Sequence, residues 1–155
     1  MAVDKLIIDK LLRPITLWVH PEGRVTGSIF VTPEQADQAA ERPVDVLNND
    51  SPFLVLQKHD PEEIRFYNRS AIVRAEYQRD KGDQTATTHT FNCCLTMMDG
   101  SELTGIVQEC LPSDFPRLYD YLNQGQERFI KLHSDDGMTY LVNKSYVTQV
   151  VSKDS

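Results

Sequence analysis

Two aspartates occupy matching positions in the chain and are the first residues to consider for chemistry. Asp45 follows Arg42 by three residues, and Asp120 follows Arg117 in the same way. A pair of carboxylates in different environments can supply a general acid and a general base, as in many hydrolases. An aspartate at this spacing can equally cap its own helical turn or accept a hydrogen bond from the nearby arginine. The structural interpretation is favoured, because a residue retained in both halves of a chain serves what both halves share, namely the fold.

The histidines and cysteines show no spacing typical of a metal site. The patterns HxH, HExxH and CxxC, which place several ligands around one ion, are absent from the sequence. Cys93 and Cys94 would point to opposite faces of a strand, so they cannot bind one ion together. Cys110 has no evident base to activate it as a nucleophile. We therefore predict no metal, no cofactor and no enzymatic activity. The histidines are His20, His59, His89 and His133.

Length and charge narrow the possible partners. The 155 residues carry a formal net charge of −7, and an acidic protein repels polyphosphate backbones and anionic membrane surfaces. DNA and membrane partners are therefore not expected. An odd number of cysteines does not make a secreted disulfide framework. The sequence shows neither a signal-peptide pattern nor a run of about 18 apolar residues, so the cytoplasm is the expected location.

The clearest pattern in the chain is an internal repeat. Matching segments recur in the same order in both halves, at offsets of 75 to 78 residues. Chance matches would not stay collinear, so we interpret the chain as a tandem duplication. The predicted parts are residues 1–77, a linker or hairpin over 78–91, and residues 92–155. The matching pairs are Thr26-Gly27 with Thr104-Gly105, Arg42 to Asn48 with Arg117 to Asn123, Phe53 to Leu56 with Phe129 to Leu132, and Asn68 to Ile72 with Asn143 to Val147.

Each copy reads as a series of short strands. An apolar stretch, an acidic-Gly turn and a second strand indicate a hairpin, and the R-x-x-D-x-L-N segment suits one helical turn. Two further strands follow, separated by Asn-Arg-Ser or Asn-Lys-Ser, where Asn tolerates left-handed backbone. Apart from the second strand of each hairpin, the expected strands of the first copy are residues 15–19, 53–56, 64–67 and 72–77. Those of the second copy are residues 94–98, 129–132, 139–142 and 147–151.

Two helices are predicted outside this shared pattern. Val3, Leu6, Ile7 and Leu11 fall at helical spacing, in a segment that Pro14 would end. Residues 32–35, Thr-Pro-Glu-Gln, resemble a helix start, and that helix would stop before the proline at position 43. Residues 111–116, at the same place in the second copy, contain two prolines and favour a loop. The predicted fold is mainly β, with two tandem SH3-like, five-stranded barrels, an N-terminal helix and short helical turns.

With five strands, an acidic-Gly first turn, a D-x-L-N segment and a polar corner before the last strand, each copy resembles an Sm-like (LSm) domain. Sm-like proteins form rings by pairing edge strands of neighbouring domains, and many bind RNA in the central pore. The resemblance implies that Asn48 and Asn123 contact bases and that Tyr121 stacks on one, whereas Val46 at the matching position has no aromatic face. It also places Arg69, Asn143 and Lys144 in the second motif, at the same pore.

Three hypotheses of function follow. The first is a non-enzymatic assembly or binding module that forms homo-oligomers through its exposed strand edges. Three chains would close a ring of six barrels if the rotation between them allows it. The second is an RNA-binding protein whose pore residues are those named above, although the net charge of −7 counts against RNA. The third is a small hydrolytic or ligand-binding enzyme that uses Asp45 or Asp120 with a histidine.

Overall fold

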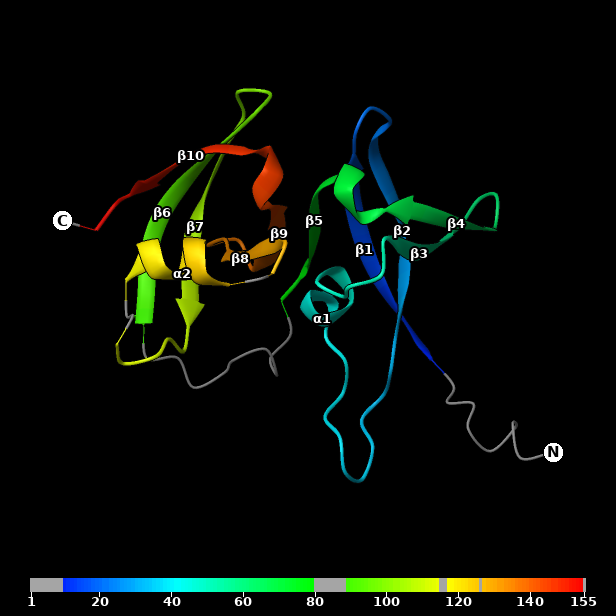
Figure 1. The fold of residues 1–155 in the computed structure, drawn as a ribbon. Helices are drawn as coiled ribbons and strands as arrows, with labels where there is room; N and C mark the ends of the chain where they lie inside the picture. Colours follow the sequence, from blue (N-terminus) through cyan, green and yellow to red (C-terminus); the bar gives the residue numbers. More distant parts are fainter. Residues whose placement is uncertain (1–9, 80–88, 115–116, 126, 155) are drawn as a thin grey trace. The chain divides into compact units, whose positions relative to one another are not determined.

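The chain is mainly β, as the sequence predicts (Figure 1). The computed structural model describes residues 10–79, 89–114, 117–125 and 127–154. The chain divides into two compact units, Met1–Ile72 and Val73–Ser155. The elements before the second unit are β1 (Leu11–Val19), β2 (Gly23–Val31), α1 (Pro43–Leu47), β3 (Phe53–Lys58), β4 (Glu63–Asn68) and the 3-10 turn η2 (Arg69–Ala71). Next come β5 (Ile72–Gln78), β6 (His89–Met97), β7 (Glu102–Glu109), α2 (Leu118–Gln124), β8 (Phe129–His133), β9 (Met138–Asn143), the 3-10 turn η4 (Lys144–Tyr146) and β10 (Val147–Ser152).

The first unit contains an antiparallel series of strands in the order β1-β2-β3-β4. In the β1–β2 hairpin Leu11 lies opposite Val31, and Val19 lies opposite Gly23. Gly23 has φ of +97°, a conformation that glycine adopts without steric cost and that the tight turn requires. Alternate strand residues point inward and form the core. The buried apolar residues of these strands include Ile15, Leu17, Val25, Ile29, Leu54 and Leu56.

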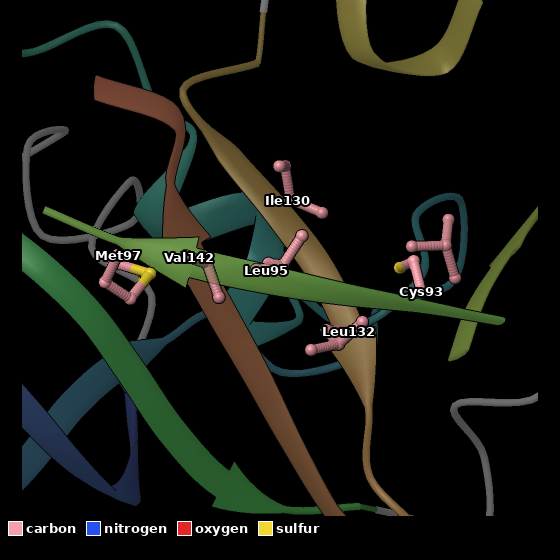
Figure 2. Close-up of a cluster of buried hydrophobic side chains, with 7 residues drawn as sticks. Cys93, Leu95, Met97, Ile130, Leu132 and Val142 are labelled. Carbon is pink, nitrogen blue, oxygen red and sulfur yellow. The ribbon is translucent and has the colours of Figure 1, made fainter. Parts of the chain in front are cut away.

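The strands of the second unit lie in the order β10-β6-β7-β8-β9-β5, and all neighbours are antiparallel. Residues 72–77, which the sequence assigns to the first copy, lie in β5, and all but Ile72 belong to the second unit. Figure 2 shows part of the core of this unit, with Cys93, Leu95 and Met97 on β6. Side chains from β8 and β9 complete the group, namely Ile130, Leu132 and Val142, together with Val107 of β7.

Short helical turns stand where the sequence predicts them. Helix α1 begins with Pro43, whose fixed φ suits the first turn of a helix. The two 3-10 turns are closed by the asparagines before them, because the side chain of Asn68 accepts from the amide of Ser70 and that of Asn143 accepts from the amide of Ser145. These corners do not use the left-handed backbone that asparagine tolerates, since the φ angles of Asn68 and Asn143 are −67° and −68°.

The helix predicted after Thr32 does not form. The amide of Glu41 donates to the Thr32 carbonyl, the Glu41 side chain accepts from the Thr32 amide, and the segment between them is a loop with a bridge between Gln35 and Gln38. This segment contains no large apolar residue. A short helix without an apolar face has nothing to pack against the core and is not stable.

Most of the predicted N-terminal helix lies outside the described residues, which begin at Lys10. The end of that prediction is wrong, because β1 starts at Leu11 and continues through Pro14 to Val19. The predicted linker over 78–91 overlaps the end of β5 and the start of β6, and its centre lies outside the described residues. No helix in the part of the chain that the structure describes is long and apolar enough to cross a membrane.

Candidate functional site

Each of the two repeated aspartates is bonded to the arginine three residues before it. The carboxylate of Asp45 accepts from the Arg42 backbone amide at 2.9 Å and from Nε at 3.3 Å. Asp120 accepts from the Arg117 amide and Nε, both at 3.0 Å, and from Nη2 at 3.2 Å. Each aspartate therefore holds the start of its own helix together, and its negative charge is neutralised by a neighbouring guanidinium.

The two pairs differ in how deeply the carboxylate is buried. The Asp45 side chain is 45% exposed, whereas that of Asp120 is 3% exposed. The hydrogen bond from Arg117 lowers the pKa of Asp120 below its ordinary value. A carboxyl group with a lowered pKa is ionised near neutral pH and holds no proton to give, so Asp120 is poorly suited to act as a general acid.

We expect the Arg117–Asp120 pair to make stability depend on pH. Because the pKa of Asp120 is lowered by folding, its contribution is complete above the ordinary aspartate pKa of about 3.9 and is lost as pH falls through the folded-state pKa. Urea unfolding of Asp120→Asn should therefore show a deficit at neutral pH that shrinks in acid. Asp45→Asn, at the exposed pair, is the control and should show the smaller deficit; a deficit for Asp120→Asn that is independent of pH would contradict the prediction.

Arg69 is a buried residue that binds backbone rather than an exposed basic group. It is 4% exposed. Its Nη1 donates to the carbonyl of Phe53 at 2.7 Å and to both the carbonyl and the hydroxyl of Ser51, and its Nη2 donates to the carbonyl of Val46 at 2.8 Å. The guanidinium thus ties the end of α1 to the start of β3. This role uses the donors that the Sm-like resemblance would direct to RNA.

Lys144, the residue of the second unit that corresponds to Arg69, is bound more loosely than Arg69. Lys144 is half-buried, and its Nζ donates to the Gly125 carbonyl at 3.5 Å. Burial lowers the pKa of Lys144. Asn143 is fully buried, and its side-chain oxygen accepts from the Ser145 amide. The basic residue in each unit therefore lies beside the C-terminal end of that unit's helix.

Tyr121 belongs to the core region of the second unit. Its ring packs against the buried cluster of Figure 2, and its hydroxyl accepts from the Lys131 amide at 3.2 Å. Burial also raises its pKa. The side chain is partly buried against this cluster. Asn123 is exposed and donates to the Tyr119 carbonyl at 2.8 Å, whereas Asn48 is half-buried at the end of α1. RNA binding therefore stays a prediction from the resemblance.

A cavity of about 420 Å³ lies in the second unit and was not predicted from the sequence. His133 is buried at its wall, with Nδ1 3.1 Å from Oγ1 of Thr139. Burial raises the pKa of the Cys93 thiol to about 11, so this group is protonated and unreactive at neutral pH. Among the described residues no group of His, Cys, Asp or Glu could hold a metal ion. The lining residues are Asn92, Cys93, Thr104, Gly105, Ile106, His133, Asp135 and Lys153.

The strand edges show an arrangement that the motifs did not reveal. β5 follows the first unit's β4 and turn η2 in the chain, yet it pairs along β9 of the second unit. In the first unit, three apolar side chains near the edge formed by β4 are exposed, namely Phe53, Ile64 and Phe66. The run from Phe53 to Leu56 is apolar at every position, a pattern typical of a strand covered on both faces. The run therefore indicates that a second apolar surface packs on the face of β3 that is exposed in a single chain.

Each repeated aspartate therefore has a capping role at the start of its own helix. In the first unit the edge strand β4 lies beside exposed apolar side chains. No family model, no curated protein and no solved structure matches the chain.

Proposed function

We propose that the protein is a non-enzymatic assembly module that consists of two Sm-like repeats and self-associates by pairing strand edges. The observation that carries this proposal is the pairing of β5 with β9 from Arg74 opposite Val142 to Gln78 opposite Met138. By the sequence repeat β5 is the last strand of the first copy, and it is added to the edge of the second copy's strands. The chain thus contains one example of the contact that would join separate copies.

Each chain has two strand edges at which the same contact can recur. Within the described residues β4 pairs only with β3, and β10 pairs only with β6. These two edges differ from one another, so contacts between copies would run head to tail. We propose that such contacts close into a ring, with three chains supplying six repeats.

The contacts of the titratable residues support a non-enzymatic role. Asp45 and Asp120 are bonded to Arg42 and Arg117 at their helix starts. The raised pKa of Cys93 keeps its thiol protonated. These aspartates stabilise helix starts and this thiol stays protonated, whereas a catalytic site needs groups whose protonation state suits proton transfer or nucleophilic attack.

Light scattering coupled to size-exclusion chromatography tests the assembly. We expect a particle that contains two or more copies of the 17.7 kDa chain. It should contain three copies if the ring closes. The particle should dissociate on dilution, because non-covalent association follows mass action. A single species of one chain's mass at every concentration would contradict the proposal.

A further inference from the structure

The two units bury corresponding parts of their sheets to different extents. In the first unit Phe53, Ile64 and Phe66 are 51%, 49% and 66% exposed. Alternate strand residues point to opposite faces, so these side chains lie on the face away from the buried Leu54 and Leu56. We call this face of β3 and β4, defined by Phe53, Ile64 and Phe66, the outer face.

The corresponding residues of the second unit are buried. Phe53 lies opposite Asn68, and Phe129 lies opposite Asn143, which sets Phe129 as the counterpart of Phe53. At an offset of 75 residues, Thr139 and Leu141 are the counterparts of the exposed pair on β4. In contrast to the outer face, Phe129, Thr139 and Leu141 are only 2%, 0% and 0% exposed.

The added strand β5 accounts for part of this difference. Ala75 lies opposite Leu141, and Tyr77 lies opposite Thr139. Side chains of directly opposed residues in antiparallel strands lie on the same face, so Ala75 and Tyr77 extend the face that contains Leu141. Both are buried, at 0% and 2% exposure. The outer face of the first unit has no such strand beside it in the described residues.

We propose, on the basis of the assembly function above, that the outer face and the edge of β4 receive β10 of a second copy of this chain. The pairing would have the register of β5 with β9. Adding 75 to a residue number of β5 gives the corresponding residue of β10, and subtracting 75 from one of β9 gives the corresponding residue of β4. This shift sets Val150 opposite Phe66, Ser152 opposite Ile64 and Lys153 opposite Glu63.

The chemistry of the two edges fits this register. Val150 lies at the margin of the second unit's core cluster and is half-buried, so Phe66 of another copy would extend that apolar surface. Lys153 is exposed and would meet Glu63, whose carboxylate is also in an ion pair with Arg65 of its own strand at 2.6 Å. The opposite charge of Lys153 would add to that pair. Within the chain the same register position holds Gln78 and Met138, which are uncharged. The charge pair therefore distinguishes the junction between copies from the junction within one chain.

Disulfide trapping tests the register. The background carries Cys110→Ser and also Cys93→Ala, because Ser152 lies directly opposite Cys93 within the chain and a cysteine at position 152 would pair with it. In this background a chain carrying Ile64→Cys and Ser152→Cys should form covalent oligomers on mild oxidation, because directly opposed residues have the Cα separation that a disulfide needs. The matched control carries Arg65→Cys with Ser152→Cys. A shift of one residue turns the side chain to the opposite face, so this control should remain mainly unlinked.

The outcomes separate this inference from the proposed function. Association in light scattering without preferential cross-linking of the Ile64 and Ser152 pair would overturn the register while leaving self-association in place. A protein that remains a single chain in light scattering would overturn both.

Substitutions on the outer face give a second measurement. Phe66→Ser should weaken self-association roughly tenfold or more, because it removes an aromatic side chain that would be buried on association. The change should leave the fold intact, since Phe66 is 66% exposed. Met98→Ser, at an exposed apolar residue beyond β6 in the second unit, is the control and should have no effect. Equal weakening by both variants would overturn the proposal.

The charge pair can be tested by exchange. Glu63→Lys should weaken self-association by about threefold and Lys153→Glu by a similar factor, as expected for like charges placed opposite each other. The double variant should recover the part of the loss that comes from the pairing with Lys153, whereas the ion pair of Glu63 with Arg65 within the chain stays broken. A double variant that associates no better than Glu63→Lys alone would exclude this pairing of Glu63 with Lys153.

Discussion

Replacing Arg69 with methionine is expected to lower the free energy of unfolding by about 3 kcal/mol. The guanidinium donates to the backbone carbonyls of Val46, Ser51 and Phe53. Methionine fills similar space but donates no hydrogen bond, and each buried polar group left unsatisfied costs about 1–3 kcal/mol. A loss of this size is a large share of the stability of a small domain.

The measurement uses the single tryptophan of the chain. Trp18 lies on β1 in the first unit, so its fluorescence during urea unfolding reports on the unit that contains Arg69. Lys144→Met is the matched control at the corresponding turn of the second unit, followed by circular dichroism. Lys144 is half-buried with one long contact to Gly125, so its loss should cost less than about 1 kcal/mol. Equal losses for the two variants would show that the backbone contacts of Arg69 contribute little.

Replacing Gly27 with alanine is expected to cost roughly 3 kcal/mol, the upper part of the range for overpacking. A Cβ at this position would lie 2.6 Å from the backbone oxygen of Gln57 and 3.0 Å from Cγ of Leu56. The oxygen belongs to β3, which pairs with β2 beside this point. Because the clash is with backbone, relief requires the two strands to move apart.

Trp18 fluorescence in urea also measures this loss. Thr26→Ala is the matched control, because Thr26 is the exposed neighbour of Gly27 on the same strand, and its replacement should change stability by less than about 0.5 kcal/mol. A similar loss is expected for Gly105→Ala, where a Cβ would lie 2.6 Å from the His133 oxygen. Stability unchanged in Gly27→Ala would show that β2 and β3 approach each other less closely than the structure indicates.

Several features were predictable because they depend on neighbouring residues. The strands follow from short apolar runs between turns, and the R-x-x-D spacing places Asp45 and Asp120 within reach of Arg42 and Arg117. The helix predicted after Thr32 does not form, and the capping pattern on which the prediction rested does not reveal why. Its capping residues favour a helix start, but helix stability also needs an apolar face that packs on the core.

The repeated Thr-Gly pair shows the limit of local patterns. Thr26-Gly27 and Thr104-Gly105 mark the duplication in the sequence, yet nothing nearby explains why glycine stands at these positions. The reason is the close approach of β3 or β8, whose backbone oxygen lies 2.6 Å from the point that a Cβ would occupy. Those strands lie about 30 residues further along the chain.

The amino-acid order was sufficient for the β character, the helical turns and the collinear repeat, because hydrogen bonds and periodicity over a few residues specify them. Long-range packing settled the rest. It buries Arg69 against three carbonyls and turns Tyr121 toward a core. It also covers Leu141 while exposing Phe66 at the same repeat position. Equivalent residues acquire different surroundings once distant strands pair, and no local pattern contains that information.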